Sequence, residues 1–109
     1  MREIKFRIWD KKNSVWLKRF NLNLLDLYIE DLSIVEINQY TGLKDKNRTE
    51  IYEGDIVKWK NREKDIFKYA KVFFEDGAFR LYNTYFELNK YENLEVVGNI
   101  YENPEICCK

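Results

Sequence analysis

The chain has 109 residues, enough for one domain around a single core, and its 19 basic and 19 acidic residues cancel. No overall field therefore attracts the chain to nucleic acid or to an acidic membrane surface. It contains no histidine, which excludes a Ser–His–Asp site and removes the commonest general base and the commonest metal ligand. We therefore expect no catalysis, no bound metal or cofactor, and no evident small-molecule substrate.

The first predicted element is a strand over residues 3–9. Ile4, Phe6 and Ile8 alternate there with charged residues, which is the period of a strand with one buried face. We therefore expect these three side chains to contribute to the core.

The start of the sequence also bears on location. It is charged and alternating, with no apolar stretch of the kind that follows the basic start of a signal peptide, and no apolar run is long enough to span a bilayer. The only two cysteines, Cys107 and Cys108, are neighbours without a distant partner, so we expect free thiols. These features predict a cytoplasmic protein without membrane contact.

Four further segments follow before the middle of the chain. They are a polar turn, a returning strand that completes a hairpin, a segment compatible with either a strand or one helical turn, and another strand. In chain order these segments are residues 10–14, 15–20, 21–28 and 32–40.

Glycine and aspartate mark the predicted turns in the second half of the chain. Gly42 opens a long polar turn, and Gly54 supplies a left-handed residue in a second turn that Asp55 caps. A catalytic role for Asp55 is the alternative, because the glycine before it lets the backbone turn sharply. Asp76 and Gly77 stand between two strand-like segments, which predicts a two-residue type I′ hairpin with positive φ at both residues.

Three further strands are predicted. They cover residues 56–60, 66–74 and 94–101, and Gly98 in the last of them indicates a bulge or bend. The two faces of the segment 66–74 differ little in polarity, which favours burial on both sides or an oligomer contact. A helical turn is expected near residues 85–88. Short strands separated by frequent turns predict a mainly β protein, either a small barrel or a sandwich.

The loop around residues 44–50 combines oxygen ligands with basic residues. Asp45, Asn47 and Glu50 carry the side-chain oxygens that a cation prefers. The neighbouring basic residues repel a divalent ion, and the segment lacks the central glycine and the further acids of a calcium loop. We therefore expect a solvated loop and no metal site.

Two consecutive predicted strands interleave cations with aromatic residues. Small barrels bind single-stranded nucleic acid by stacking bases on such rings and by contacting phosphates with lysine and arginine. Strand alternation places Trp59 on the core face, away from the lysines on either side of it, and places Lys68 and Tyr69 on opposite faces. The candidate nucleic-acid contacts are Lys58, Lys60, Arg62, Lys68, Tyr69 and Lys71.

Aromatic residues are abundant for a chain of this length. Eight Tyr, seven Phe and three Trp exceed what one small core easily encloses, and rings left at the surface tend to form interfaces. The favoured function is therefore a protein-interaction or self-assembling module that forms a homo-oligomer or binds another protein. The alternative is a small barrel that binds single-stranded nucleic acid.

Several phrases of the sequence occur together in a distinctive order. MREIKFRIWD stands at residues 1–10, and QYTGLKDKN runs on to EIYEGDIV within residues 39–57. VFFEDGAF at residues 72–79 is followed by LEVVGNIYENPE at residues 94–105. In these phrases the chain closely resembles the YopX family of phage and prophage proteins over nearly its whole length.

The resemblance implies a fold and a context. The expected fold is mainly β and forms a single domain over residues 1–109, with an SH3-type small barrel in the C-terminal two-thirds, residues 39–106. An N-terminal β-hairpin portion, residues 1–38, packs on this barrel. The expected context is a phage or prophage gene of a low-GC bacterium, with phage or host proteins as partners. The resemblance implies no reaction.

One residue departs from the family's usual pattern. The turn after residues 44–47 usually carries a glycine where this chain has Arg48. Because arginine disfavours left-handed backbone, Asn47 would have to supply any left-handed residue in this loop. The departure bears on the shape of the loop and not on the fold.

Overall fold

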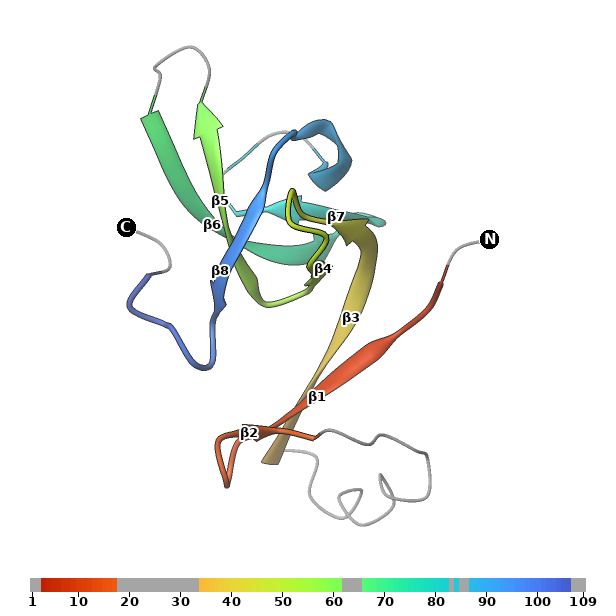
Figure 1. The fold of residues 1–109 in the computed structure, drawn as a ribbon. Coiled ribbons are helices and arrows are strands. Elements are labelled where there is room, and N and C mark those ends of the chain that lie inside the picture. The colour runs from red at the N-terminus through yellow and green to blue at the C-terminus, as the bar shows by residue number, and fades with distance from the viewer. Residues whose placement is uncertain (1–2, 18–33, 62–65, 83, 85–86, 107–109) are drawn as a thin grey trace.

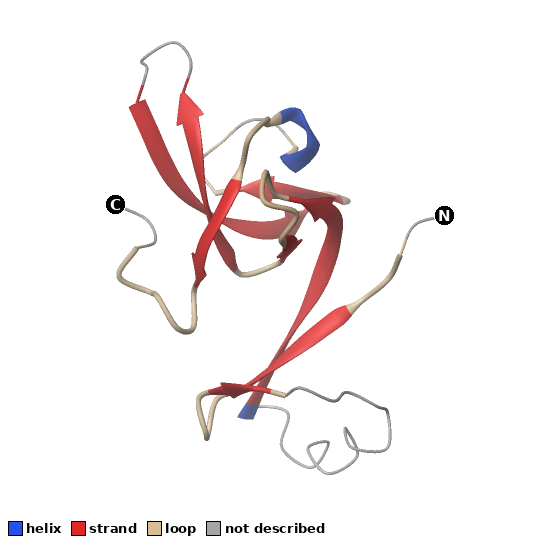
Figure 2. Ribbon diagram, viewed as in Figure 1, coloured by secondary structure: helices blue, strands red, loops and turns tan. Residues whose placement is uncertain are grey.

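The computed structural model describes residues 3–17, 34–61, 66–82, 84 and 87–106, and these form two four-stranded antiparallel sheets (Figure 1). The strand order is β2-β1-β3-β4 in the first sheet and β7-β6-β5-β8 in the second. Among these residues, helical structure is confined to short turns (Figure 2). The elements are β1 (Phe6–Asp10), β2 (Val15–Trp16), β3 (Val35–Lys44), β4 (Glu50–Tyr52), β5 (Asp55–Asn61), β6 (Ile66–Glu75), β7 (Ala78–Leu81), the 3₁₀ turn η2 (Leu88–Lys90) and β8 (Glu95–Asn99).

The first sheet begins with the predicted hairpin. Asp10 is buried at its turn, where Oδ1 accepts hydrogen bonds from the backbone N–H groups of Lys12 (2.9 Å) and Asn13 (3.1 Å). A carboxylate that binds the backbone in this way closes a turn without help from a neighbouring strand. β2 then pairs with β1, which confirms the hairpin over the described residues.

Burial along β1 differs from the expected alternation. Ile8 is buried, but Ile4 and Phe6 on the same face are exposed, so their assignment to the core is wrong. Trp9 and Asp10 are buried beside Ile8. Burial therefore follows position along the strand, because β1 is covered on both faces at its C-terminal end and open at its start.

β3 connects the two halves of the first sheet. It pairs with β1 up to Gln39 and with β4 from Tyr40 onward, so the expected boundary between residues 38 and 39 falls inside this strand, close to where its partner changes. The register with β4 shifts before Lys44, and Gly42 in this bulge has a φ of +86°. The prediction that Gly42 opens a turn is wrong, because the glycine bends a continuous strand instead.

The main core lies on the inner face of the second sheet, which curls around it into half of a barrel (Figure 1). Trp59 packs against this core, as the alternation of β5 predicts. The buried residues of the core are Ile51, Val57, Ala70, Val72, Phe79, Leu81, Leu88 and Leu94.

β5 and β6 continue beyond their neighbours as a projecting hairpin. β8 pairs with β5 only from Asp55 to Lys58, and β7 pairs with β6 only from Val72 to Glu75. The first four residues of β6, from Ile66 to Tyr69, are exposed, so burial on both sides is wrong for this part of the strand. The oligomer contact stays a prediction.

Gly98 lies at a bulge in β8, which confirms its predicted role. Ile56 pairs with Gly98, whereas the next residue, Val57, pairs with Val96, so the register shifts by one residue. A Cβ on Gly98 would lie 2.6 Å from Oδ1 of Asn103, closer than two such atoms can approach. Glycine is therefore required here by the close approach of the turn that follows β8.

The prediction of a mainly β protein is confirmed, with an N-terminal sheet and a curled C-terminal sheet. The closer description as an SH3-type barrel stays a prediction. No helix in the described parts of the chain is long and apolar enough to cross a membrane. Several expected features lie outside the described residues, in whole or in part: residues 21–28, the end of the strand 15–20, the start of the strand 32–40, residues 85–86, Arg62, Cys107 and Cys108.

Candidate functional site

A buried ion pair joins the first sheet to the start of β5. Nη2 of Arg7, on β1, lies 2.8 Å from Oδ1 of Asp55, which is 2% exposed. Nη2 also donates to the carbonyl oxygen of Glu53 at 3.1 Å, and Nε donates to Oδ1 of Asn38 at 3.2 Å. Arg7 was not among the candidates from the sequence, where it reads only as a charged residue on the open face of a strand.

Asp55 caps its turn as predicted. Oδ2 accepts a hydrogen bond from the backbone N–H of Tyr52 at 2.8 Å, and Gly54 has a φ of +83°. Burial raises the pKa of Asp55 above its ordinary value, although the charge of Arg7 and the Tyr52 N–H act in the opposite direction. Because each carboxylate oxygen already has a partner, this geometry supports the turn-capping interpretation over the catalytic one.

Aromatic rings enclose the Arg7 guanidinium. Its carbon lies 4.2 Å from the ring centroid of Trp16 and 4.8 Å from that of Tyr52. Tyr101, beyond β8, stacks on Trp9 at 5.4 Å and accepts a hydrogen bond from Nδ2 of Asn38 at 2.9 Å on its hydroxyl. The cluster therefore connects β1, β2, β3 and the turn after β8, and its contacts are those of a structural junction between the two sheets.

Asp45 forms a second junction. Oδ1 accepts hydrogen bonds from the backbone N–H groups of Asn47 (2.8 Å) and Thr49 (2.9 Å), and Oδ2 accepts one from Val96 of β8 at 2.8 Å. Burial tends to raise the pKa of Asp45, but these three donors and the charge of Lys46 outweigh it and lower the pKa. Asp45 is buried, so the expectation of a solvated loop is wrong at this residue.

The loop geometry accounts for the carboxylate without a cation. Both oxygens of Asp45 face N–H donors, which repel a metal ion. Within the described parts of the chain, no three His, Cys, Asp or Glu residues are grouped so that they could hold a metal ion.

The left-handed residue of this loop is Arg48, with a φ of +67°, so the prediction that Asn47 takes this role is wrong. The N–H groups on either side of Arg48, those of Asn47 and Thr49, donate hydrogen bonds to Asp45. These bonds explain the difference, since they hold the loop in one shape whichever residue stands between the two donors. At the other predicted turn, Asp76 and Gly77 have φ values of +53° and +76°, and Glu75 pairs with Ala78. Positive φ at both residues of a two-residue hairpin is confirmed.

Replacing Arg48 by glycine should stabilise the protein. Left-handed backbone costs a residue with a Cβ about 1–2 kcal/mol, and glycine relieves this cost. The greater conformational freedom of glycine in the unfolded chain offsets part of the resulting stabilisation. We expect the free energy of unfolding to rise by about 0.5–1 kcal/mol, measured by urea denaturation. Arg48 is exposed, so little packing is lost. The same change at Asn47 should not stabilise the protein, and equal gains at both positions would contradict the assignment.

The structure separates the predicted nucleic-acid contacts into two groups. Lys58 pairs with Tyr69, Lys60 pairs with Phe67, and Lys71 pairs with Ile56, so Lys58, Lys60, Tyr69 and Lys71 share the outer face of the second sheet. Lys68 pairs with Trp59 on the opposite face. Arg62 lies outside the described residues.

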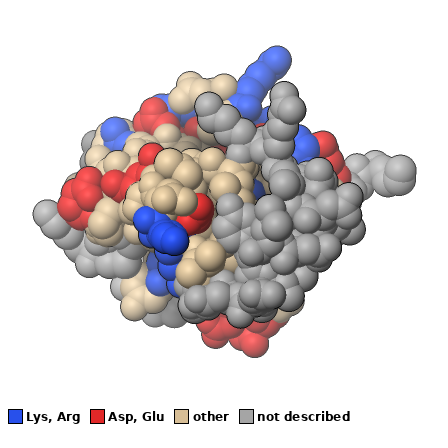
Figure 3. All heavy atoms as spheres, turned by 90° about the horizontal axis from the view of Figure 1, so that it is seen from below, with Lys and Arg blue, Asp and Glu red and all other residues tan. Residues whose placement is uncertain are grey.

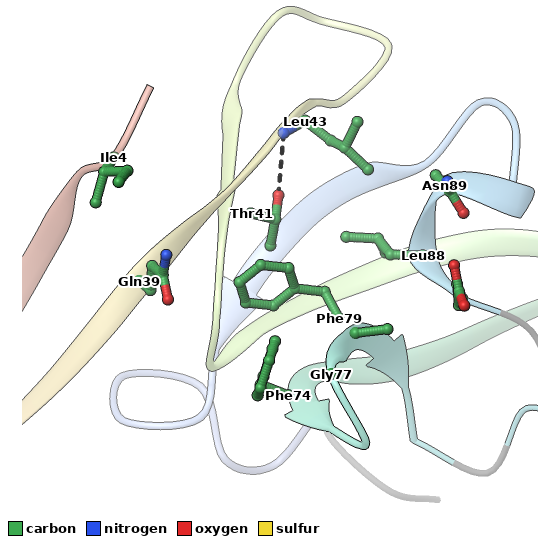
Figure 4. A pocket seen from close by; sticks show the side chains of 11 residues that line it. Ile4, Gln39, Thr41, Leu43, Phe74, Gly77, Phe79, Leu88 and Asn89 are labelled. Carbon is green, nitrogen blue, oxygen red and sulfur yellow. Dashed lines mark hydrogen bonds between the residues drawn. The ribbon is translucent and has the colours of Figure 1, made fainter. Parts of the chain in front are cut away.

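A groove of about 490 Å³ lies between β3, the β6–β7 hairpin and η2 (Figure 4). Large apolar side chains line it, and two of them are conspicuously open to solvent: Ile4 is 68% exposed and Phe74 is 50% exposed. Phe79 packs edge-to-face against Phe74 with a centroid distance of 5.1 Å. Phe6 and Ile37, exposed on the same face of the first sheet as Ile4, extend the apolar surface beyond the groove.

Polar side chains also line the groove. Gln39, Glu87 and Asn89 line it, and the Thr41 hydroxyl is engaged within the protein, donating to the carbonyl of Ile51 at 2.7 Å and accepting from the N–H of Leu43 at 3.2 Å. No constellation for acid–base chemistry converges among the described residues that line the groove. Its mixture of exposed apolar side chains and polar groups suits the binding of a protein surface. The sequence did not indicate it, because Ile4 and Phe74 follow the pattern of core residues.

Charge is mixed on the side of the molecule that carries the first sheet. Figure 3, seen from below Figure 1, shows Lys and Arg interspersed with Asp and Glu among the described residues. Opposite charges in close alternation do not produce a strong field of one sign. The described residues on this side therefore form no extended electrostatic surface for a polyanion.

Comparisons with known proteins agree on a family and a fold. The sequence matches the model of a family described as "YopX protein" over residues 5–107. The structure is similar to the crystal structure of protein EF1440 from Enterococcus faecalis, with 25% sequence identity and a TM-score of 0.70, over 96% of this chain and 98% of that one. None of the curated proteins matches the chain.

Proposed function

Because the chain belongs to the YopX family, membership of which implies no reaction, we propose that it is a phage or prophage protein that acts without catalysis in the host cytoplasm. Its function is to bind a protein, either a second copy of itself or a phage or host partner. The groove between β3 and the β6–β7 hairpin is the binding surface.

The exposure of apolar side chains around this groove carries the proposal. Ile4 and Phe74 stand at its edge with half or more of their surface in water, and Phe6 and Ile37 adjoin them. Burying such side chains is favourable by roughly 25 cal/mol per Å², so a contiguous apolar surface of this kind marks an interaction site. Gln39, Glu87 and Asn89 also line the groove, so a partner must place hydrogen-bonding groups opposite them as well as an apolar surface opposite Ile4 and Phe74.

The acidic residues that attract attention in the sequence support a role in structure. Asp10, Asp45 and Asp55 each accept hydrogen bonds from the backbone N–H groups of a turn. An acid engaged in this way is held away from a substrate, and a general acid or base must reach its substrate directly or through one water. The absence of histidine from the sequence points in the same direction.

Self-association is the form of binding to test first. We expect light scattering over a range of concentrations to report a mass larger than that of one chain, and expect Ile4→Ser and Phe74→Ser to shift the population toward single chains. Both side chains are exposed, so neither change should unfold the protein. The measurement is the molar mass of each variant at matched concentration.

Ile66→Ser is the matched control. Ile66 is similarly exposed but lies on the projecting β5–β6 hairpin, outside the groove. It should leave the mass unchanged. Two results together would overturn the proposal. One is a wild-type chain that remains a monomer at every concentration, and the other is the lack of any protein that binds the wild type but not Phe74→Ser.

A further inference from the structure

We propose that the outer face of β5 and β6 is a second binding site, separate from the groove, and that its ligand is single-stranded nucleic acid. The register of the two strands places alternate side chains on this face, directly across from one another. Tyr82 joins them from the end of β7, where its N–H donates to the carbonyl of Lys71 at 3.0 Å. We call this surface the lysine–aromatic face; it comprises Lys58, Lys60, Phe67, Tyr69, Lys71 and Tyr82.

Its rings are open to solvent. Phe67 is 57% exposed, Tyr69 44% and Tyr82 43%. Phe67 and Tyr69 are two residues apart on one strand, which places their Cα atoms about 7 Å from each other. Rings arranged in this way on a sheet can each receive an unstacked base, and every base has a face that can stack.

Ammonium groups lie beside these rings. Nζ of Lys58 lies 4.3 Å from the ring centroid of Phe67, and Nζ of Lys71 lies 5.1 Å from that of Tyr82. A lysine is a flexible point charge, so it can move from the ring to a phosphate when a base takes its place. The lysine–aromatic face therefore combines stacking surface with charge for the adjoining phosphates.

Two acidic residues limit the strength of binding. Glu95 lies across from Lys58 in the register with β8, although its carboxylate is 3.8 Å from Nζ of Lys46. Glu75 lies at the far end of β6. With Lys58 and Lys71 beside the rings and a net charge of zero, the logarithm of the dissociation constant should rise with the logarithm of the salt concentration with a slope of about 1.4.

Duplexes and proteins are less suitable ligands for this face. Bases inside a duplex are stacked on one another and cannot stack on Tyr69 or Phe67. Lysine is depleted at protein–protein interfaces, whereas three of the six residues of this surface are the lysines Lys58, Lys60 and Lys71. The observations therefore favour a single-stranded polyanion with planar bases.

Fluorescence anisotropy with a labelled oligothymidylate of about 12 nucleotides tests the proposal. We expect binding at about 20 mM salt that weakens at about 200 mM, with poor competition by a duplex of equal length. Tyr69→Ala should weaken binding by roughly tenfold or more, whereas Tyr69→Phe, which keeps the ring, should retain it. Lys58→Gln should weaken binding and lower the salt slope by about 0.7.

Lys68→Gln is the matched control, because it makes the same charge change on the opposite face of β6. It should leave the dissociation constant nearly unchanged. Absence of binding at low salt, binding indifferent to salt, equal competition by the duplex, or an equal effect of Lys68→Gln and Lys58→Gln would each overturn the proposal. A face that is instead a protein interface would show no oligonucleotide binding and a change of molar mass in Tyr69→Ala.

Discussion

Replacing Arg7 by methionine should lower the free energy of unfolding by about 3 kcal/mol or more, because it leaves the buried carboxylate of Asp55 without its partner. The change also removes the hydrogen bonds from Arg7 to Asn38 and to the carbonyl of Glu53. Methionine keeps much of the volume of the side chain between Trp16 and Tyr52, so the loss is mainly electrostatic. Urea denaturation of both proteins at neutral pH is the measurement.

The pH dependence of this variant identifies the cause. Without Arg7, burial raises the pKa of Asp55 further above its unfolded value of about 4. When the pKa of a carboxyl group is higher in the folded protein than in the unfolded chain, the protein becomes less stable as the pH rises through the folded pKa. The difference in the free energy of unfolding between Arg7→Met and wild type should therefore shrink as the pH falls from 7 toward about 4. A deficit that does not change with pH would contradict this explanation.

A surface ion pair supplies the comparison for Arg7. Nζ of Lys11 lies 3.1 Å from Oε1 of Glu36, and both side chains are exposed over nearly half of their surface. Lys11→Met should change the free energy of unfolding by less than about 1 kcal/mol. Similar effects of Lys11→Met and Arg7→Met would show that burial is not what makes the Arg7–Asp55 pair important.

Replacing Asp45 by alanine should destabilise the protein by about 2–3 kcal/mol, because three backbone N–H groups lose their acceptor. Two of these donors shape the loop before β4, and the third belongs to Val96 of β8, so the change loosens a connection between the two sheets. We expect a fall in melting temperature on the order of 10–20 °C, measured by circular dichroism.

Asp45→Asn and an acid titration complete this test. Asparagine keeps one oxygen acceptor but places an amide donor against another N–H, so its effect should be intermediate. Because the folded pKa of Asp45 is lowered, its contribution is present above about pH 4 and is lost as the pH falls through the folded pKa. The difference between wild type and Asp45→Asn should therefore shrink in acid. An Asp45→Asn protein as stable as wild type at pH 7 would contradict the role of the carboxylate.

Features of the fold that depend on near neighbours follow from the sequence. The Asp76–Gly77 hairpin is predicted because two residues with positive φ suit the twist of the flanking strands, and both have positive φ in the structure. The direction of Trp59 toward the core, and of Lys58 away from it, follows from the two-residue period of a strand. The bulge at Gly98 is a third example of a local feature.

The candidate sites depended on more distant contacts. The sequence indicated Lys58, Tyr69 and Lys71, but the register showed that they share a face and that Lys68 does not. It gave no sign of the groove, because Ile4 and Phe74 have the alternation of core residues, yet both are exposed in the structure. The exposure of a side chain depends on how the sheets pack against each other, and the alternation of apolar residues along a strand does not predict that packing.

Local chemistry alone determined the mainly β class, the tight hairpin turn and the orientation of side chains along single strands, since each involves residues a few positions apart. Only the tertiary structure decided that Arg7 meets Asp55, that Asp45 reaches Val96, and that Arg48 takes the left-handed position beside Asp45. The physical reason is that a buried charge or a strained residue is stable only with specific partners. The packing of the two sheets brings those partners from distant parts of the chain.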